Sequence, residues 1–158
     1  MSEKEYAKQA KAYLQQAFLL GKQIKTEQEK IDHLRSKIEY KSPSFDGQGS
    51  GTSGNSSDKM AAVVAEIVEY EQEKAQLMLN YIHKYKEIEQ TIGEIEDDVE
   101  REILERRYLL CEPWEGGYDK QSGKYIQGIA EKVGYSVRAV YKKHGLALIK
   151  VKIPESVQ

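Results

Sequence analysis

The sequence predicts an all-α protein with two parts, a long antiparallel helical hairpin of coiled-coil type and a C-terminal helix-turn-helix domain. Two heptad patterns separated by a stretch rich in Gly and Ser predict the hairpin over residues 1–96. A compact pattern of apolar, small and basic residues predicts the helix-turn-helix within residues 97–158.

The first element is a helix expected from Ser2 to Tyr40. It contains no proline and a single glycine, and apolar residues recur in it every seven positions. This spacing places the apolar side chains on one face of a helix. One seam of that face consists of Ala10, Ala17, Ile24, Ile31 and Ile38, and the complementary seam consists of Tyr6, Tyr13, Leu20 and Leu34.

Residues 41–57 are rich in Gly and Ser and nearly lack apolar side chains. Because burial cannot offset the entropy lost on ordering such a stretch, we expect a flexible loop. A second heptad helix follows to residue 96, with Asp58 as its expected N-cap. Two long helices joined by a flexible loop most simply fold back on each other, but the same heptads can also pair between two chains.

The two heptad helices also share polar interruptions. In an antiparallel hairpin Glu27 falls opposite Glu71 and Lys74. We therefore expect a contact between Glu27 and Lys74. Such a pair adds little stability but can fix the register of two helices.

Positive charge is concentrated near the end of the chain. The net charge is −2, yet the stretch from Tyr118 to Lys152 holds eight basic residues and two acidic ones. An acidic body with a basic end indicates that only the end contacts a polyanion. Lysines also cluster by chance on solvated faces, so charge alone does not decide the matter.

The domain after residue 97 begins with a helix that runs to about Leu110, where Pro113 stops it. Asp97 followed three residues later by Glu100 resembles a capping box. The next stretch, residues 114–124, contains Gly116, Gly117 and Gly123, and we expect a loop or a small hairpin there.

Two short helices and a sharp turn are predicted after this loop. Ala130 lies where a crossing helix comes close and a small side chain is required. Gly134 follows four residues later, where a chain leaving a helix often adopts the left-handed conformation. Ser136 is a good N-cap for the next helix, expected over about residues 136–150. In that helix Val137, Val140 and Tyr141 recur at helical spacing and are expected to face inward.

The opposite face of this last helix is small and positive and contains no acid, as a helix entering the major groove requires. Its outward residues are Arg138, Ala139, Lys142 and Lys143.

The run from Asp98 to Val151 resembles region four of bacterial sigma factors, which reads the −35 promoter element. The matching residues are Glu102, Leu104, Arg107, Tyr108, Ile129, Ala130, Glu131, Gly134, Ser136, Arg138, Val140, Tyr141, Ala147, Leu148 and Ile149. The whole layout is similar to small phage- and prophage-encoded proteins with a helical hairpin, a Ser/Gly-rich loop and such a C-terminus. Their relatives include late-transcription regulators of the RinA and ArpU type. The loop over residues 112–124 is longer than in these proteins, and its Trp114 and Tyr118 lack an explanation.

The resemblance implies a phage-encoded transcriptional regulator that binds double-stranded DNA. The groove-facing residues would be Ser136, Arg138, Ala139, Lys142 and Lys143, with Arg107 and Lys124 holding the DNA backbone beside them. Arg138 can pair bidentately with a guanine, while lysines more often contact phosphates. The helical hairpin would supply self-association or a contact to RNA polymerase.

Two other functions stay open at this point. A small terminase subunit, which packages DNA, also joins a helix-turn-helix to helical hairpins and forms rings. A protein-interaction module that inhibits a host polymerase or another host factor would show no salt-dependent affinity for DNA.

Other classes of function receive no support from the residues. No nucleophile–base pair indicates an enzyme, and no cofactor motif is present. Cys111 and the three histidines lack partners at metal-ligand spacing. The charged start of the chain does not read as a secretory signal, and no apolar run is long enough to cross a bilayer, so we expect a cytoplasmic protein of the bacterial host.

Overall fold

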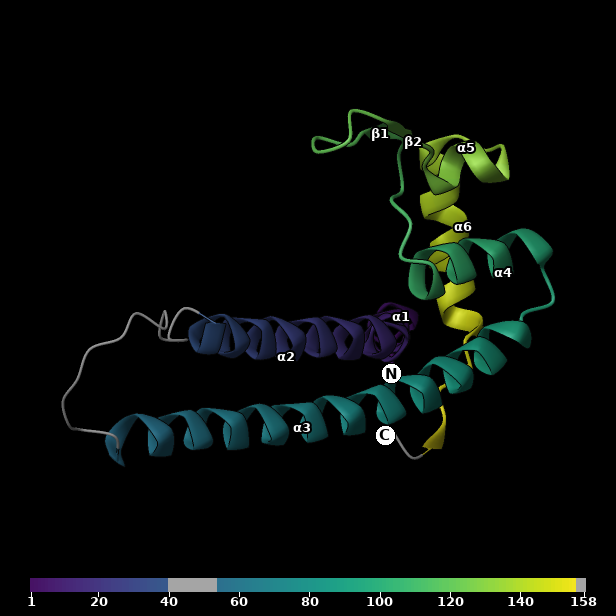
Figure 1. Cartoon of the computed structure of the whole chain (residues 1–158). Helices are drawn as coiled ribbons and strands as arrows, with labels where there is room; N and C mark the ends of the chain where they lie inside the picture. Colours follow the sequence, from purple (N-terminus) through teal and green to yellow (C-terminus); the bar gives the residue numbers. More distant parts are fainter. Residues whose placement is uncertain (40–53, 156–158) are drawn as a thin grey trace. The chain divides into compact units, whose positions relative to one another are not determined.

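A computed structural model describes residues 1–39 and 54–155 and is mostly helical, as predicted (Figure 1). The helices are α1 (Glu3–Leu14), α2 (Gln16–Glu39), α3 (Gly54–Gly93), α4 (Asp98–Leu104), the π-helix η1 (Glu105–Leu109), α5 (Ile129–Val133) and α6 (Val137–Lys150). The strands β1 (Gly117–Tyr118) and β2 (Tyr125–Ile126) form an antiparallel pair. The chain divides into two compact units, one of Met1–Leu19 with Tyr81–Gln158 and one of Leu20–Asn80.

The helix boundaries differ from the predicted ones at three places. A single helix was expected from Ser2 to Tyr40, but the structure has a break between α1 and α2 at Gln15. Helix α3 begins at Gly54, so Asp58 lies inside the helix and is not its N-cap. The last four residues of the expected flexible loop over residues 41–57 therefore belong to α3. The rest of that stretch lies outside the described residues.

The core of the first unit is built from α1, the end of α3, α4, η1 and α6. Helix α6 contacts both α4 and α1. The buried side chains of this core are Ala10, Tyr13, Leu14, Ala17, Ile88, Ile92, Ile95, Leu104, Tyr108, Ala147, Leu148 and Val151. Leu14 is fully buried although it lies outside both predicted heptad seams. The division into compact units therefore differs from the predicted boundary at residue 96, because α1 packs with the C-terminal helices.

The second unit has a small apolar core and a polar layer next to it. Ile31, Leu34 and Ile67 are buried together. Beside them, Lys74 Nζ donates to Gln28 Oε1 at 2.6 Å. Glu27 Oε1 instead accepts from Lys30 Nζ at 2.7 Å, on its own helix.

The predicted contact between Glu27 and Lys74 is thus replaced by one between Lys74 and the neighbouring Gln28. The shift is one residue along α2. Lys30 pairs with Oε1 of Glu27 because residues three apart on a helix are neighbours, while the buried Oε2 of Glu27 has no hydrogen-bond partner among the described residues. The lysine of α3 pairs with the adjacent amide of Gln28.

A buried histidine lies on α6 in the core of the first unit. His144 is 8% exposed, and its Nε2 lies 2.8 Å from the hydroxyl oxygen of Tyr108 in η1. The ring of Trp114 meets the same imidazole edge-on at 4.8 Å between centroids. Burial lowers the pKa of His144 to about 4, helped by the positive charges of Lys11 and Arg107. The imidazole is therefore neutral near pH 7.

This histidine makes the stability of the fold depend on pH. The folded-state pKa of His144, about 4, lies below its ordinary value of 6.5, so the unfolded chain binds the proton first. Its contribution to stability is constant above about pH 6.5 and is lost as the pH falls toward 4, by roughly 3 kcal/mol. We expect the free energy of unfolding of His144→Gln, measured in urea, to fall less than that of the original chain as the pH is lowered from about 6.5 to 4. Equal losses in both proteins would contradict the assignment.

Candidate nucleic-acid interface

Helix α4 and the π-helix η1 form the support of the interface. The N–H of Glu100 donates to Asp97 Oδ1 at 2.9 Å, which caps the start of α4 as predicted. The second half of the expected capping box is absent, because the Glu100 carboxylate accepts from Lys150 Nζ at 2.6 Å. The pair therefore joins α4 to the last turn of α6. After η1 the chain turns at Cys111, which has a left-handed φ of 55°.

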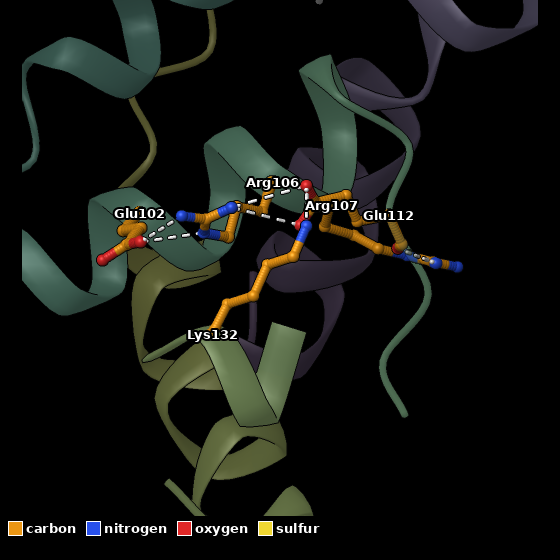
Figure 2. A network of polar contacts seen from close by, with 5 residues as sticks. All are labelled: Glu102, Arg106, Arg107, Glu112 and Lys132. Carbon is orange, nitrogen blue, oxygen red and sulfur yellow. Dashed lines mark hydrogen bonds and ion pairs between the residues drawn. The ribbon is translucent and has the colours of Figure 1, made fainter. Parts of the chain in front are cut away.

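One carboxylate then ties η1 to α5. Figure 2 shows Glu112 between Arg106 of η1 and Lys132 of α5. Its Oε1 accepts from Lys132 Nζ at 2.6 Å and its Oε2 lies 3.3 Å from Arg106 NH1. The carbonyl of the same residue accepts from Arg107 NH1 at 3.0 Å. Arg106 is held from the other side by Glu102 at 2.8 Å. The network fixes the residues that lead into α5.

The turn between α5 and α6 has the predicted geometry. Gly134 ends α5 in the left-handed region, with φ 72° and ψ 30°. The N–H of Tyr135 donates to the carbonyl of Ala130 at 3.1 Å and closes the turn. Ser136 then caps α6, because its Oγ accepts from the N–H of Ala139 at 3.2 Å.

A separate small core holds α4, α5 and α6 together. Ile103, Ile129, Ala130 and Val140 are buried in it, and Val137 packs against it. Tyr141 was expected to face inward with these residues, but 48% of it is exposed. Its ring lies on Trp114 instead, at 5.1 Å between centroids. The indole, whose position the sequence did not reveal, occupies the space next to the core.

The structure brings five of the predicted DNA-binding residues together at the start of α6. Ser136, Arg138 and Lys142 are exposed, while Ala139 and Lys143 are partly buried. Lys143 Nζ lies 5.3 Å from the centre of the Tyr135 ring, a cation–π contact that orients the lysine. Arg138 and Lys142 lie one helical turn apart, so they share a face of the helix.

The two flanking residues are placed differently from each other. The Arg107 guanidinium lies 4.8 Å from the centre of the Trp114 ring and also donates to the carbonyl of Glu112. Arg107 is partly buried, and these two contacts hold its guanidinium beside the loop. Its predicted contact with the DNA backbone stays a prediction. Lys124 is exposed beside the strand β2.

Ion pairs neutralise some of the basic residues that the sequence places near the end of the chain. Among the eight basic residues from Tyr118 to Lys152, three are paired with acids from earlier in the chain. These pairs are Lys132–Glu112, Lys150–Glu100 and Lys152–Glu94. The other five have no ion pair with any residue that the structure describes, and they are Lys120, Lys124, Arg138, Lys142 and Lys143. The uncompensated charge thus gathers on the first half of α6 and on the segment around β1 and β2.

Two glycines of the first unit, Gly128 and Gly145, provide a matched pair for a stability test. A Cβ on Gly128 would lie 2.3 Å from the carbonyl carbon of Glu115, whereas a Cβ on Gly145 of α6 would meet nothing within 4 Å. We expect Gly128→Ala to lower the free energy of unfolding by about 2 kcal/mol through this overlap. Gly145→Ala should raise it by about 0.5–1 kcal/mol, because alanine favours the helix. Thermal or urea unfolding measures both, and a stable Gly128→Ala protein would contradict the close approach.

Comparison of the chain with protein-family models, with curated proteins and with solved structures found no match. Within residues 1–39 and 54–155, no helix is long and apolar enough to span a bilayer. Over the same residues, no group of three or more His, Cys, Asp or Glu side chains is arranged to hold a metal ion. The function proposed for the chain therefore depends on its own charges and geometry.

Proposed function

We propose that the chain is a sequence-specific DNA-binding regulator of transcription, encoded by a phage, that reads promoter DNA with α6. In this proposal α5, the turn at Gly134 and α6 form a helix-turn-helix, and the start of α6 enters the major groove. Arg138 reads a base, while Ser136, Lys142 and Lys143 contact phosphates. The resemblance of this region to region four of sigma factors supports the same placement.

One observation carries the proposal: acids pair with basic residues around α6, whereas Arg138 and Lys142 on its outward face have no ion pair among the described residues. Lys132 and Lys150 are engaged by Glu112 and Glu100 at 2.6 Å each. Arg138 and Lys142 are exposed and form no ion pair with any residue between 1 and 39 or 54 and 155. Cations that are left without acids on a well-supported helix are available to phosphates and to guanine.

The second unit would serve self-association or a contact to RNA polymerase. The pairs Gln28–Lys74 and Arg35–Glu71 link α2 to α3 and support an antiparallel hairpin there. Val64 and Met78 lie at apolar heptad positions of α3 and are 46% and 45% exposed, so the described residues do not cover this part of the helix. Apolar side chains at heptad spacing suit a partner helix, and a second copy of this chain would supply one.

Arg138 provides the first test of the DNA-binding proposal. Selection of bound DNA from a random pool at two salt concentrations should enrich one motif. Arg138→Ala should then lower the preference for that motif over a scrambled site by about tenfold or more, because a bidentate contact to guanine contributes ~1–3 kcal/mol of discrimination. Lys142→Ala should instead weaken binding to both sites alike and lower the salt slope by about one.

Lys152→Ala is the matched control, because it removes an exposed lysine that already lies 3.0 Å from Glu94. It should leave both the preference and the slope nearly unchanged. If the original chain enriches no motif and shows no salt-dependent affinity, the DNA-binding proposal fails. An unchanged preference in Arg138→Ala would remove only its base-reading role.

The mass of the protein in solution tests the role of the second unit. We expect a dimer that Val64→Glu with Met78→Glu converts to a monomer, because charges at heptad positions oppose helix pairing. Light scattering coupled to size exclusion measures this. A ring of about eight or more subunits would instead favour the DNA-packaging function, and a monomer in the original chain would contradict the proposed self-association.

A further inference from the structure

The strands β1 and β2 form an exposed hairpin with a well-defined turn. Gly117 pairs with Ile126 and Tyr118 with Tyr125. Beyond these pairs the N–H of Asp119 donates to the carbonyl of Lys124 at 2.8 Å. The Asp119 carboxylate accepts from both the N–H and the hydroxyl of Ser122, at 2.8 and 2.6 Å. Such a turn holds the shape of the hairpin although no core covers it.

The base of this hairpin is fixed to α5. The N–H groups of Ile129 and Ala130 donate to the carbonyls of Pro113 and Trp114, at 2.9 and 3.2 Å. The Tyr125 hydroxyl also donates to Glu131 Oε1 on α5, at 2.6 Å. The hairpin therefore keeps one orientation relative to α5, and Figure 1 shows it beside that helix.

The stem of the hairpin also contacts α6, next to its outward face. Trp114, which precedes β1, packs on Tyr141 of α6 with 5.1 Å between ring centroids. Tyr141 lies three residues after Arg138, so the two side chains are neighbours on the helix surface. The chain thus runs from the side of the groove-facing residues directly into β1.

The hairpin exposes two lysines and two tyrosines, and the one acid between Gly117 and Ile126, Asp119, accepts hydrogen bonds from Ser122 within the turn. Lys120 and Lys124 are exposed and form no ion pair with the described part of the chain. Tyr118 and Tyr125 are 77% and 50% exposed, and their rings meet edge-to-face at 5.2 Å between centroids. Large aromatic side chains placed outside any core point to a surface that contacts another molecule.

We propose that this hairpin is a second DNA-binding element, which grips the sugar-phosphate backbone next to the segment read by α6. Lys120 and Lys124 contact phosphates, and the two tyrosine rings pack against the sugars between them. Such contacts carry no sequence information but fix the orientation of the protein on the duplex. The proposal rests on the DNA-binding function proposed above and extends the bound segment beyond the reach of one helix.

The test compares two double variants of the full chain on the selected DNA site. Lys120→Gln with Lys124→Gln removes the hairpin charges, and Lys4→Gln with Lys8→Gln removes two exposed lysines of α1 as a control of equal charge. We expect the hairpin variant to bind roughly tenfold or more weakly at 0.1 M salt and to lose about two from the salt slope. Its preference for the selected over a scrambled site should stay unchanged. The control should change affinity less than about threefold.

Hydroxyl-radical footprinting of the same complexes supplies a second readout. The original chain should protect a stretch of backbone that the hairpin variant and Tyr118→Ala leave open, while protection around the α6 site stays. Equal footprints and slopes in the original chain and the hairpin variant would overturn this inference alone and would favour the hairpin as a protein contact. If the original chain binds no DNA, both this inference and the proposed function fail. Circular dichroism of each variant confirms that it is folded.

Discussion

The interface depends on the carboxylate of Glu112. It lies between Arg106 of η1 and Lys132 of α5, and its backbone carbonyl holds Arg107. Without it two cations would face each other where the chain enters the hairpin, and Lys132 would add its charge to the outer surface. Because buried or half-buried ion pairs are costly to break from one side, the loss of this carboxylate would disturb both helices it joins. Glu112 thus links η1 to α5 and neutralises one of the three paired lysines near the interface.

Local sequence rules for turns and helix caps predicted part of the candidate site. Gly134 and Ser136 are positions where the chemistry of one residue decides the backbone, and the structure has the left-handed turn and the cap where they were predicted. The charge of the surface was not predictable in this way. Lys150 is neutralised by Glu100, fifty residues earlier in the chain, and only the packing of α4 on α6 brings them together. The predicted inward orientation of Tyr141 was wrong for the same reason, because its position depends on Trp114 in a distant loop.

The heptads predicted that the two stretches on either side of residues 41–57 are helical, but not what each helix packs against. Periodicity describes one face of a helix and is silent about its partner. Leu14 lies off that face and is nevertheless fully buried, because α1 has neighbours on more than one side. The hydroxyl of Tyr6 even donates to the carbonyl of Val151, at 2.6 Å, near the other end of the sequence. Contacts between residues so far apart determine the compact units, and local sequence patterns do not reveal them.

Trp114 is the only tryptophan of the chain, and it stands where the hairpin stem, α6 and His144 meet. Its intrinsic fluorescence therefore reports on this region without an added label. The indole ring lies close to the guanidinium of Arg107 and to two aromatic side chains of α6, Tyr141 and His144. A movement of α6 against the loop changes the surroundings of this one fluorophore, so its emission reports on the contact between α6 and the loop.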